Sequence, residues 1–421
     1  MTQRLKFWTV LCSTLLTVML VIGALMGKDQ GDQGAYKPLG VYSEVLRHIK
    51  SDYVEDPDIS KVTRGALQGL IEHLDPMSSY LGPEEHSSFE KSQANPDKGT
   101  GLSTGLVVHK RVGYVTVLSV LPDSSADKAG IRIGDLIEAV DGLSTRAMPP
   151  AYLYALLSGK PDTSVKVLVR SLRNSEEPEE YTLKRGPVIL PAAEHKVLDD
   201  GVGYLDLDVL DKDRVDQAAK AIKALESQGV SRIVLDLRAN SVGDTAEGVR
   251  LANLFMDEGK IASLNGQQYP EKVFEADPES TLTRLPLVLI TDRATAGGAE
   301  LAAAALLDSK RAKLVGERTY GLAALQKTIL LDDGAALILS IAKYHRPTGE
   351  ALQDGGVTPS DPVSAADVRR YRESQFPSDL KDPPPAGVPA EEDGEDPYLK
   401  KAIEVVKEAE AAAAEPEKKA A

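Results

Sequence analysis

Residues 202–361 alternate short, strongly apolar runs with amphipathic helical stretches, and this alternation constrains the fold more than any other feature of the sequence. The strand-like runs cover residues 233–237, 287–290 and 313–316. The helical stretches between them cover residues 215–227, 247–255 and 298–307. Strands and helices in alternation must bury their apolar sides against each other in layers, so this region is predicted to form an α/β domain.

A different pattern begins the chain. Arg4 and Lys6 precede an uncharged run, Phe7–Met26, whose 20 residues would span about 30 Å as a helix. Residues 1–26 are therefore predicted to be a single, uncleaved transmembrane helix in the inner membrane, with its positive end in the cytoplasm and the rest of the chain periplasmic or extracytoplasmic. A cleaved signal peptide is the alternative, although residues 24–27 make a poor cut site.

Composition excludes several classes of function. The formal charge of −15 argues against nucleic acid as a partner. The chain has 1 cysteine and 6 histidines without clustered spacing, so neither a disulfide nor a metal site is expected. No cofactor is predicted.

The rest of the chain divides by pattern. Apolar residues at helical spacing predict a small helical region over residues 36–92, and short strands around a helix at 150–157 predict a β domain over 99–173. Residues 364–396 form a Pro-rich, acidic linker, followed by a helix over 397–414. Its narrow stripe of Leu399, Ala402, Val405 and Val406 would dock on its own fold or on a second subunit, and a homo-oligomer is expected.

The β region contains a run of about twenty residues, 123–142, with Ala129-Gly130 for close packing, a turn at Gly134-Asp135 and a hairpin turn at Asp141-Gly142. This run closely resembles a PDZ domain. The resemblance implies binding of protein C-terminal peptides by strand addition, with the terminal carboxylate held by a loop that here comprises Ser103, Thr104, Gly105 and Leu106. Alternatively, the domain only packs against or gates its neighbour.

From about Leu39 to Asp361 the chain resembles the C-terminal processing, or tail-specific, serine proteases. The resemblance rests on residues 52–54, 74–81, 203–205, 234–240, 316–321, 344–350 and 356–361. It implies a peptidase domain of the ClpP/crotonase type over residues 185–363. Such proteases use a serine activated by a neutral, desolvated lysine, with backbone N–H groups as the oxyanion hole.

Transferring these roles to the present sequence reveals a departure. The nucleophile position is Gly297 and the lysine position is Leu322, at the family interval of 25 residues. Asp308, Glu300 and Gln326 remain at their family positions. Residues 240–243 replace an Asn-Pro-Gly-Gly turn, in which Gly243 could still offer an oxyanion amide while Val242 would resist a positive φ.

Glycine cannot attack a carbonyl and leucine cannot accept a proton, so the peptidase is predicted to be catalytically degenerate. It would act as a scaffold, adaptor or regulator that binds protein C-termini, and it could join an active relative in a mixed oligomer. One alternative is an active serine- or threonine-type endopeptidase cutting near protein C-termini, with Thr295 and Lys327 as a relocated dyad or with a group borrowed from a partner. A passive structural element of the envelope is the third hypothesis.

Overall fold

The computed structural model describes residues 33–95, 102–171, 177–187, 190–375 and 395–418, together with Trp8, residues 13 and 14, and residues 17–19. The membrane anchor predicted over residues 1–26 falls almost wholly outside this part of the chain and stays a prediction. Within the described part, no helix has both the length and the apolar character that a membrane crossing requires. Contacts divide the chain into two compact units, residues 1–67 and 68–421.

The first unit consists of helix α2 (Gln33–Asp52) and most of α3 (Ile59–Glu72). Of the apolar side chains in these helices, Leu39, Val41 and Val45 are exposed, whereas Ile49 and Leu67 are half-buried. The second unit opens with the end of α3, the short strand β1 (Ser79–Leu81) and α4 (Pro83–Gln93).

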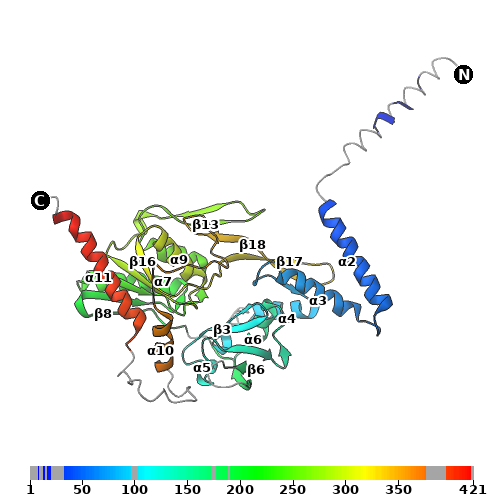
Figure 1. Cartoon of the computed structure of the whole chain (residues 1–421), viewed down its shortest axis with the longest axis horizontal. Coiled ribbons are helices and arrows are strands. Elements are labelled where there is room, and N and C mark those ends of the chain that lie inside the picture. The colour runs from blue at the N-terminus through cyan, green and yellow to red at the C-terminus, as the bar shows by residue number, and fades with distance from the viewer. Residues whose placement is uncertain are drawn as a thin grey trace. The chain divides into compact units, whose positions relative to one another are not determined.

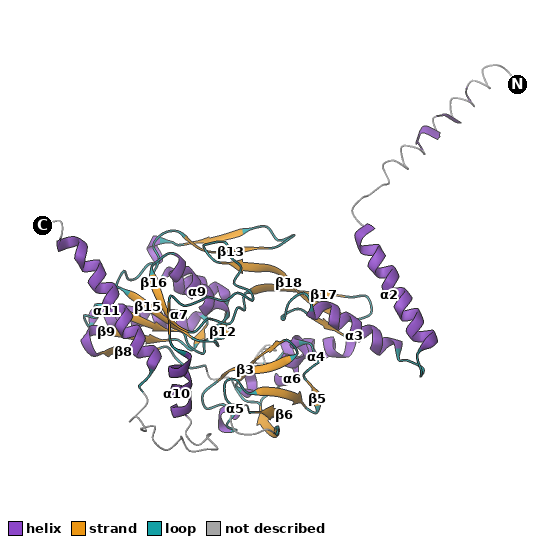
Figure 2. Ribbon diagram, viewed as in Figure 1, coloured by secondary structure: helices purple, strands orange, loops and turns teal. Residues whose placement is uncertain are grey.

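An antiparallel sheet with the order β2-β3-β4-β6-β7 forms the body of the PDZ-like region, and β5 pairs with β4. Figure 2 shows this region, with strands β3, β5 and β6 and helix α6 labelled. A buried cluster that includes Leu106, Val117, Ile137, Leu153 and Val167 fills the space between this sheet and α6. Strand β7 was missed by the sequence prediction because its charged residues hide the alternation. The bounds are β2 Leu106–Arg111, β3 Tyr114–Val120, α5 Ser125–Lys128, β4 Leu136–Val140, β5 Leu143–Ser144, α6 Pro150–Leu157, β6 Ser164–Arg170 and β7 Glu179–Lys184.

The predicted α/β domain is built on a sheet with the order β19-β16-β15-β11-β9-β8, in which only β8 runs antiparallel to its neighbour. Its central strands are buried on both faces, which explains their continuous apolar sequence. The bounds are β8 Glu194–Leu198, β9 Val202–Asp206, α7 Lys212–Ser227, β11 Arg232–Asp236, α8 Thr245–Asn253, β15 Leu287–Thr291, α9 Gly297–Asp308, β16 Ala312–Gly316 and β19 Asp361–Pro362.

Residues of one strand point alternately to two cores. In β11, Ile233 and Leu235 join the core under α7, α8 and α9, whereas Val234 joins a second core under the C-terminal helix α11 (Pro397–Lys418). Figure 1 shows α11 on the opposite side of the sheet from α9. Ala402, Val405 and Val406 of the predicted stripe are fully buried there, so the stripe docks on its own fold, the first of the two predicted alternatives. Self-association stays a prediction.

A second sheet, with the order β1-β18-β13-β14 and with β17 also paired to β18, extends from the α/β domain. The sequence prediction did not identify this sheet. A small parallel pair, β10–β12, lies near the carboxyl ends of the main strands. The bounds are β10 Val209–Leu210, β12 Val242–Gly243, β13 Lys260–Asn265, β14 Lys272–Glu275, β17 Ala324–Leu330, β18 Ala336–His345 and α10 Ala365–Gln375.

Candidate functional site

The nucleophile and base positions lie side by side. Gly297 is the first residue of α9 and has φ +61°, and a Cβ atom built on it would have Leu322 O as its nearest neighbour outside the adjacent residues, at 3.8 Å. The aligned positions therefore meet in space as a nucleophile and its base must. Neither carries a reactive group, because Gly297 lacks a side chain and Leu322 presents a half-buried aliphatic one.

Close helix packing fixes the position of the α9 N-terminus. A Cβ on Gly248 in α8 would come within 2.2 Å of Gly298 O, and one on Gly298 within 2.4 Å of Asp244 O. The two helices can approach this closely only because both residues are glycine. The backbone at the site is thus held by contacts that a serine at position 297 would leave intact.

Glu300 ties the start of α9 to the loop that carries Leu322. Its carboxylate accepts hydrogen bonds from Gly321 N (2.8 Å) and Leu322 N (3.0 Å), and Thr319 Oγ1 also donates to it. Burial raises the pKa of Glu300 to about 7, against the lowering effect of these hydrogen bonds. Glu300 therefore shapes the loop and needs no catalytic role to explain its presence.

The other retained residues also have structural partners. Asp308 accepts a bidentate pair from Arg346, with Nε–Oδ2 at 3.0 Å and Nη2–Oδ1 at 2.5 Å, and its side chain is only 5% exposed. Gln326 Nε2 donates to Met77 O (2.8 Å), which joins β17 to the turn before β1. The retention of these side chains therefore does not argue for activity.

The turn that would supply an oxyanion amide holds Val242 without a positive φ. The positive φ values fall on Ala239 (54°) and Gly243 (147°), so Val242 keeps an ordinary backbone conformation. A Cβ on Gly243 would lie 2.1 Å from Leu210 O, the oxygen that accepts from Asp244 N. Gly243 is thus required where the turn meets β10, while Val242, which was expected to resist a positive φ, does not adopt one.

Thr295 is placed as a structural residue. It is fully buried, and its hydroxyl donates to Leu237 O (2.7 Å) and lies 3.2 Å from Asp292 Oδ1. Lys327 is exposed on β17, whereas Thr295 is fully buried and its hydroxyl donates to a backbone carbonyl. The hydrogen bonds of Thr295 therefore give it a structural role, and the dyad with Lys327 stays a hypothesis.

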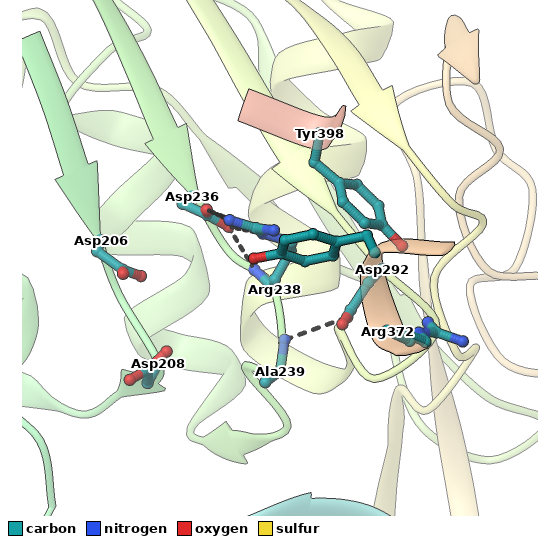
Figure 3. A pocket seen from close by; sticks show the side chains of 9 residues that line it. Asp206, Asp208, Asp236, Arg238, Ala239, Asp292, Arg372 and Tyr398 are labelled. Carbon is teal, nitrogen blue, oxygen red and sulfur yellow. Dashed lines mark hydrogen bonds and ion pairs between the residues drawn. The ribbon is translucent and has the colours of Figure 1, made fainter. Parts of the chain in front are cut away.

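A cavity of about 240 Å³ lies at the carboxyl ends of β9, β11 and β15. Figure 3 shows Asp236 paired with Arg238, and Ala239 N donating to Asp292 at 3.1 Å. Arg238 also pairs with Asp396 (2.8 Å), just before α11, and stacks 5.0 Å from the Tyr398 ring. The complete lining is Asp206, Asp208, Asp236, Arg238, Ala239, Asp292, Tyr371, Arg372 and Tyr398.

The sequence prediction missed this network. Aspartates directly after buried strands were an available signal, because the carboxyl ends of parallel strands meet at one edge of the sheet. Asp396 and Tyr398 gave no such signal, because they lie at the start of α11, far along the chain from these strands. Among the described residues, no group of His, Cys, Asp or Glu side chains is arranged to hold a metal ion.

The carboxylates that line this cavity lie close together, so the stability of this edge of the sheet should depend on pH. Burial, with Asp236 and Asp208 nearby, raises the pKa of Asp206 to about 7. A raised pKa means that the folded state holds the proton more tightly than the unfolded state does. Ionisation of Asp206 therefore lowers the free energy of unfolding as the pH rises from about 4 to 7, and above that interval the loss stays constant.

Asp206→Asn removes that cost. We expect the variant to melt at a higher temperature than the native chain at pH 8 and at the same temperature at pH 4, as measured by calorimetry at both values. Asp200→Asn, at an exposed aspartate that pairs with Lys407, is the control and should give no gain at pH 8. A gain for Asp206→Asn that is larger at pH 4 would contradict the assignment.

The predicted carboxylate loop of the PDZ-like region is closed in this structure. Ser103, Thr104 and Leu106 are buried, and Ser103 O accepts from Gly186 N (2.8 Å) at the end of the last strand of the domain. Gly105, at φ +84°, lies against Ser124 so closely that a Cβ atom would not fit. The loop has the expected position beside α6, but its residues are covered.

The PDZ-like region also touches the loop that carries Leu322. Tyr320 Oη lies 2.8 Å from His109 Nδ1 of β2, and Arg111 lies over the Tyr320 ring and pairs with Asp354 (3.4 Å). Burial, followed by the charge of Arg111, lowers the pKa of His109 to about 4, so this histidine is neutral at physiological pH. The PDZ-like region and the peptidase-like domain therefore pack against each other through β2 and this loop.

Comparisons with known proteins agree with this architecture. Residues 201–363 match Peptidase family S41, and residues 116–171 match the PDZ domain. The carboxyl-terminal-processing protease of Picosynechococcus sp. is 30% identical over 373 residues, covering 84% of this chain and 89% of the relative. The chain belongs to the C-terminal processing proteases of peptidase family S41.

Other members are similar over comparable lengths. The carboxy-terminal processing protease CtpA of Bacillus subtilis is 29% identical, covering 85% of this chain and 77% of the relative. A solved photosystem II D1 C-terminal processing protease superposes with a TM-score of 0.61 at 26% identity, covering 77% of this chain and 92% of that one. The family and the multi-domain α/β fold with a PDZ domain, both predicted from the sequence, are confirmed.

Proposed function

We propose that this family member does not cleave peptide bonds and acts by binding protein C-termini. The observation that carries the proposal is that Gly297 and Leu322 occupy the two reactive positions of the site and lie close together, since a Cβ atom built on Gly297 would be 3.8 Å from Leu322 O. A C-terminal processing protease needs a nucleophile and a base at these two positions, and both side chains are missing. What remains is a peptidase scaffold joined to a PDZ domain.

Several further properties are proposed from the sequence alone. Residues 1–26 would anchor the chain in the inner membrane, with the bulk of the protein on the extracytoplasmic side. Its partners would be proteins with free C-termini, and it could act as a scaffold, adaptor or regulator beside an active relative or a second copy of itself. The expected tails end in apolar residues, because apolar side chains such as Leu106 at the start of β2 and Leu153 of α6 fill the space between these two elements.

The native full-length chain, purified in mild detergent, is expected to leave an unstructured protein with an apolar C-terminus uncut. Intact mass measured over an extended incubation checks this, because it registers a cut at any position. Thr295→Val serves as the control for a relocated nucleophile. Cleavage by the native chain that disappears in Thr295→Val would establish the active endopeptidase instead.

A further inference from the structure

Strand β2 forms one wall of the PDZ groove, and no strand among the described residues pairs with its outer edge. It is the terminal strand of the order β2-β3-β4-β6-β7, and Val108 lies opposite Val117 of β3. Val117 directs its own N–H and C=O toward β4, to Asp135 O and Gly134 N. Val108 and Val117 are therefore a non-hydrogen-bonded pair, and Val108 turns its backbone groups toward the groove, where an added strand would pair.

The backbone carbonyl oxygen of Val108 already accepts a hydrogen bond. Tyr154, from the middle of α6 on the opposite wall, donates its hydroxyl to Val108 O at 3.1 Å. Burial raises the pKa of the Tyr154 phenol well above its ordinary value, so the hydroxyl keeps its proton and remains a donor. It makes the same hydrogen bond to β2 that a backbone N–H of a bound peptide would make.

Two further hydrogen bonds join β2 and α6, or the residues just before them. Ser103 Oγ donates to Leu157 O (3.2 Å) at the end near the carboxylate loop. Lys110 Nζ donates to Met148 O (2.8 Å) at the far end, and it also pairs with Glu72 at 2.9 Å. The groove is thus bridged at both ends and in the middle.

The outer side of α6 is also held. Ala151 packs in a buried cluster with Leu81 of β1 and Ile338 of β18, and Tyr152 lies against that cluster. Because α6 is wedged between β2 and these strands, moving the helix away from β2 would disrupt apolar packing. Rotation of the Tyr154 side chain breaks one hydrogen bond and is the smaller change.

We propose that Tyr154 closes the PDZ groove by standing in for the bound strand, so that a peptide with a free, apolar C-terminus enters only when the tyrosine leaves Val108. The inference rests on the proposed function, and it adds a residue that sets the affinity of the groove. Removing the hydroxyl while keeping the ring should lower the cost of entry and leave the walls unchanged.

Fluorescence polarisation on the full-length chain tests this, with a short labelled peptide rich in alanine and valine that carries a free C-terminal carboxylate. Tyr154→Phe is expected to bind it about three- to tenfold more tightly than the native chain, which corresponds to one net hydrogen bond. Tyr152→Phe is the matched control, since it removes a hydroxyl from the same helix on the side away from β2, and it should leave the affinity unchanged. The C-terminal amide of the peptide should bind weakly to all three proteins.

The outcomes separate the two ideas. If the native chain binds the carboxylate peptide and Tyr154→Phe binds it no better, the groove is not closed by Tyr154 and the inference is overturned alone. Equal binding of the amide and carboxylate peptides also overturns it. No binding by either chain, or cleavage of the peptide seen by mass spectrometry of the same samples, overturns the proposed function.

Discussion

The double variant Gly297→Ser, Leu322→Lys is expected to cleave an unstructured protein at least about 10³ times faster than the native chain, because loss of a nucleophile and its base costs several powers of ten in rate. The structure leaves room for the serine, whose Cβ would have Leu322 O as its nearest neighbour at 3.8 Å. A positive φ costs a serine about 1–2 kcal/mol, which the packing of α9 can bear. At the half-buried position 322, a lysine would be partly desolvated, which lowers its pKa toward that of a base.

The two single variants are the controls, since each supplies only half of the dyad and should stay inert. Intact-mass spectrometry of the substrate measures the rates, and thermal melting verifies that the variants remain folded. A folded double variant that does not cut would show that more than the dyad has been lost, for instance at the turn over residues 239–243. Cutting by Leu322→Lys alone would point to another nucleophile.

The second large effect is expected at Arg238. Arg238→Ala should lower the free energy of unfolding by about 3–5 kcal/mol, because it leaves the carboxylate of Asp236, which is only 2% exposed, without its cation. The same change frees Asp396, which accepts hydrogen bonds from Tyr398 N and Leu399 N at the start of α11. Urea unfolding followed by circular dichroism measures this loss of stability. The Arg238→Ala substitution should also release α11 from the sheet.

Arg284→Ala is the matched control. Arg284 is 78% exposed and pairs with Asp257 at 2.6 Å on the surface, so its removal should cost about 1 kcal/mol or less. Equal losses for the two arginines would contradict the view that burial of the Asp236–Arg238 pair is what matters. Susceptibility of the chain after residue 375 to limited proteolysis should rise in Arg238→Ala alone, because only that variant loosens the C-terminal helix.

Local pattern was sufficient for much of the fold. The apolar runs at 233–237, 287–290 and 313–316 correspond to β11, β15 and β16, because strands covered on both faces must be apolar throughout. The helix at 150–157 was predicted with the bounds of α6. Strands β7, β8 and β14, in contrast, are rich in charged and exposed residues and carried no readable alternation.

The sequence by itself determined the family, the domain types and the absence of a reactive side chain at positions 297 and 322, because these depend on residue identity and spacing along the chain. Only the tertiary structure decided how distant segments meet. It placed Asp396 against Arg238, the stripe of α11 on its own sheet, Gln326 against Met77 and the Tyr154 hydroxyl on Val108 O. Each of these contacts joins elements that packing brings together, and a one-dimensional pattern cannot specify the partner of a side chain across such a distance.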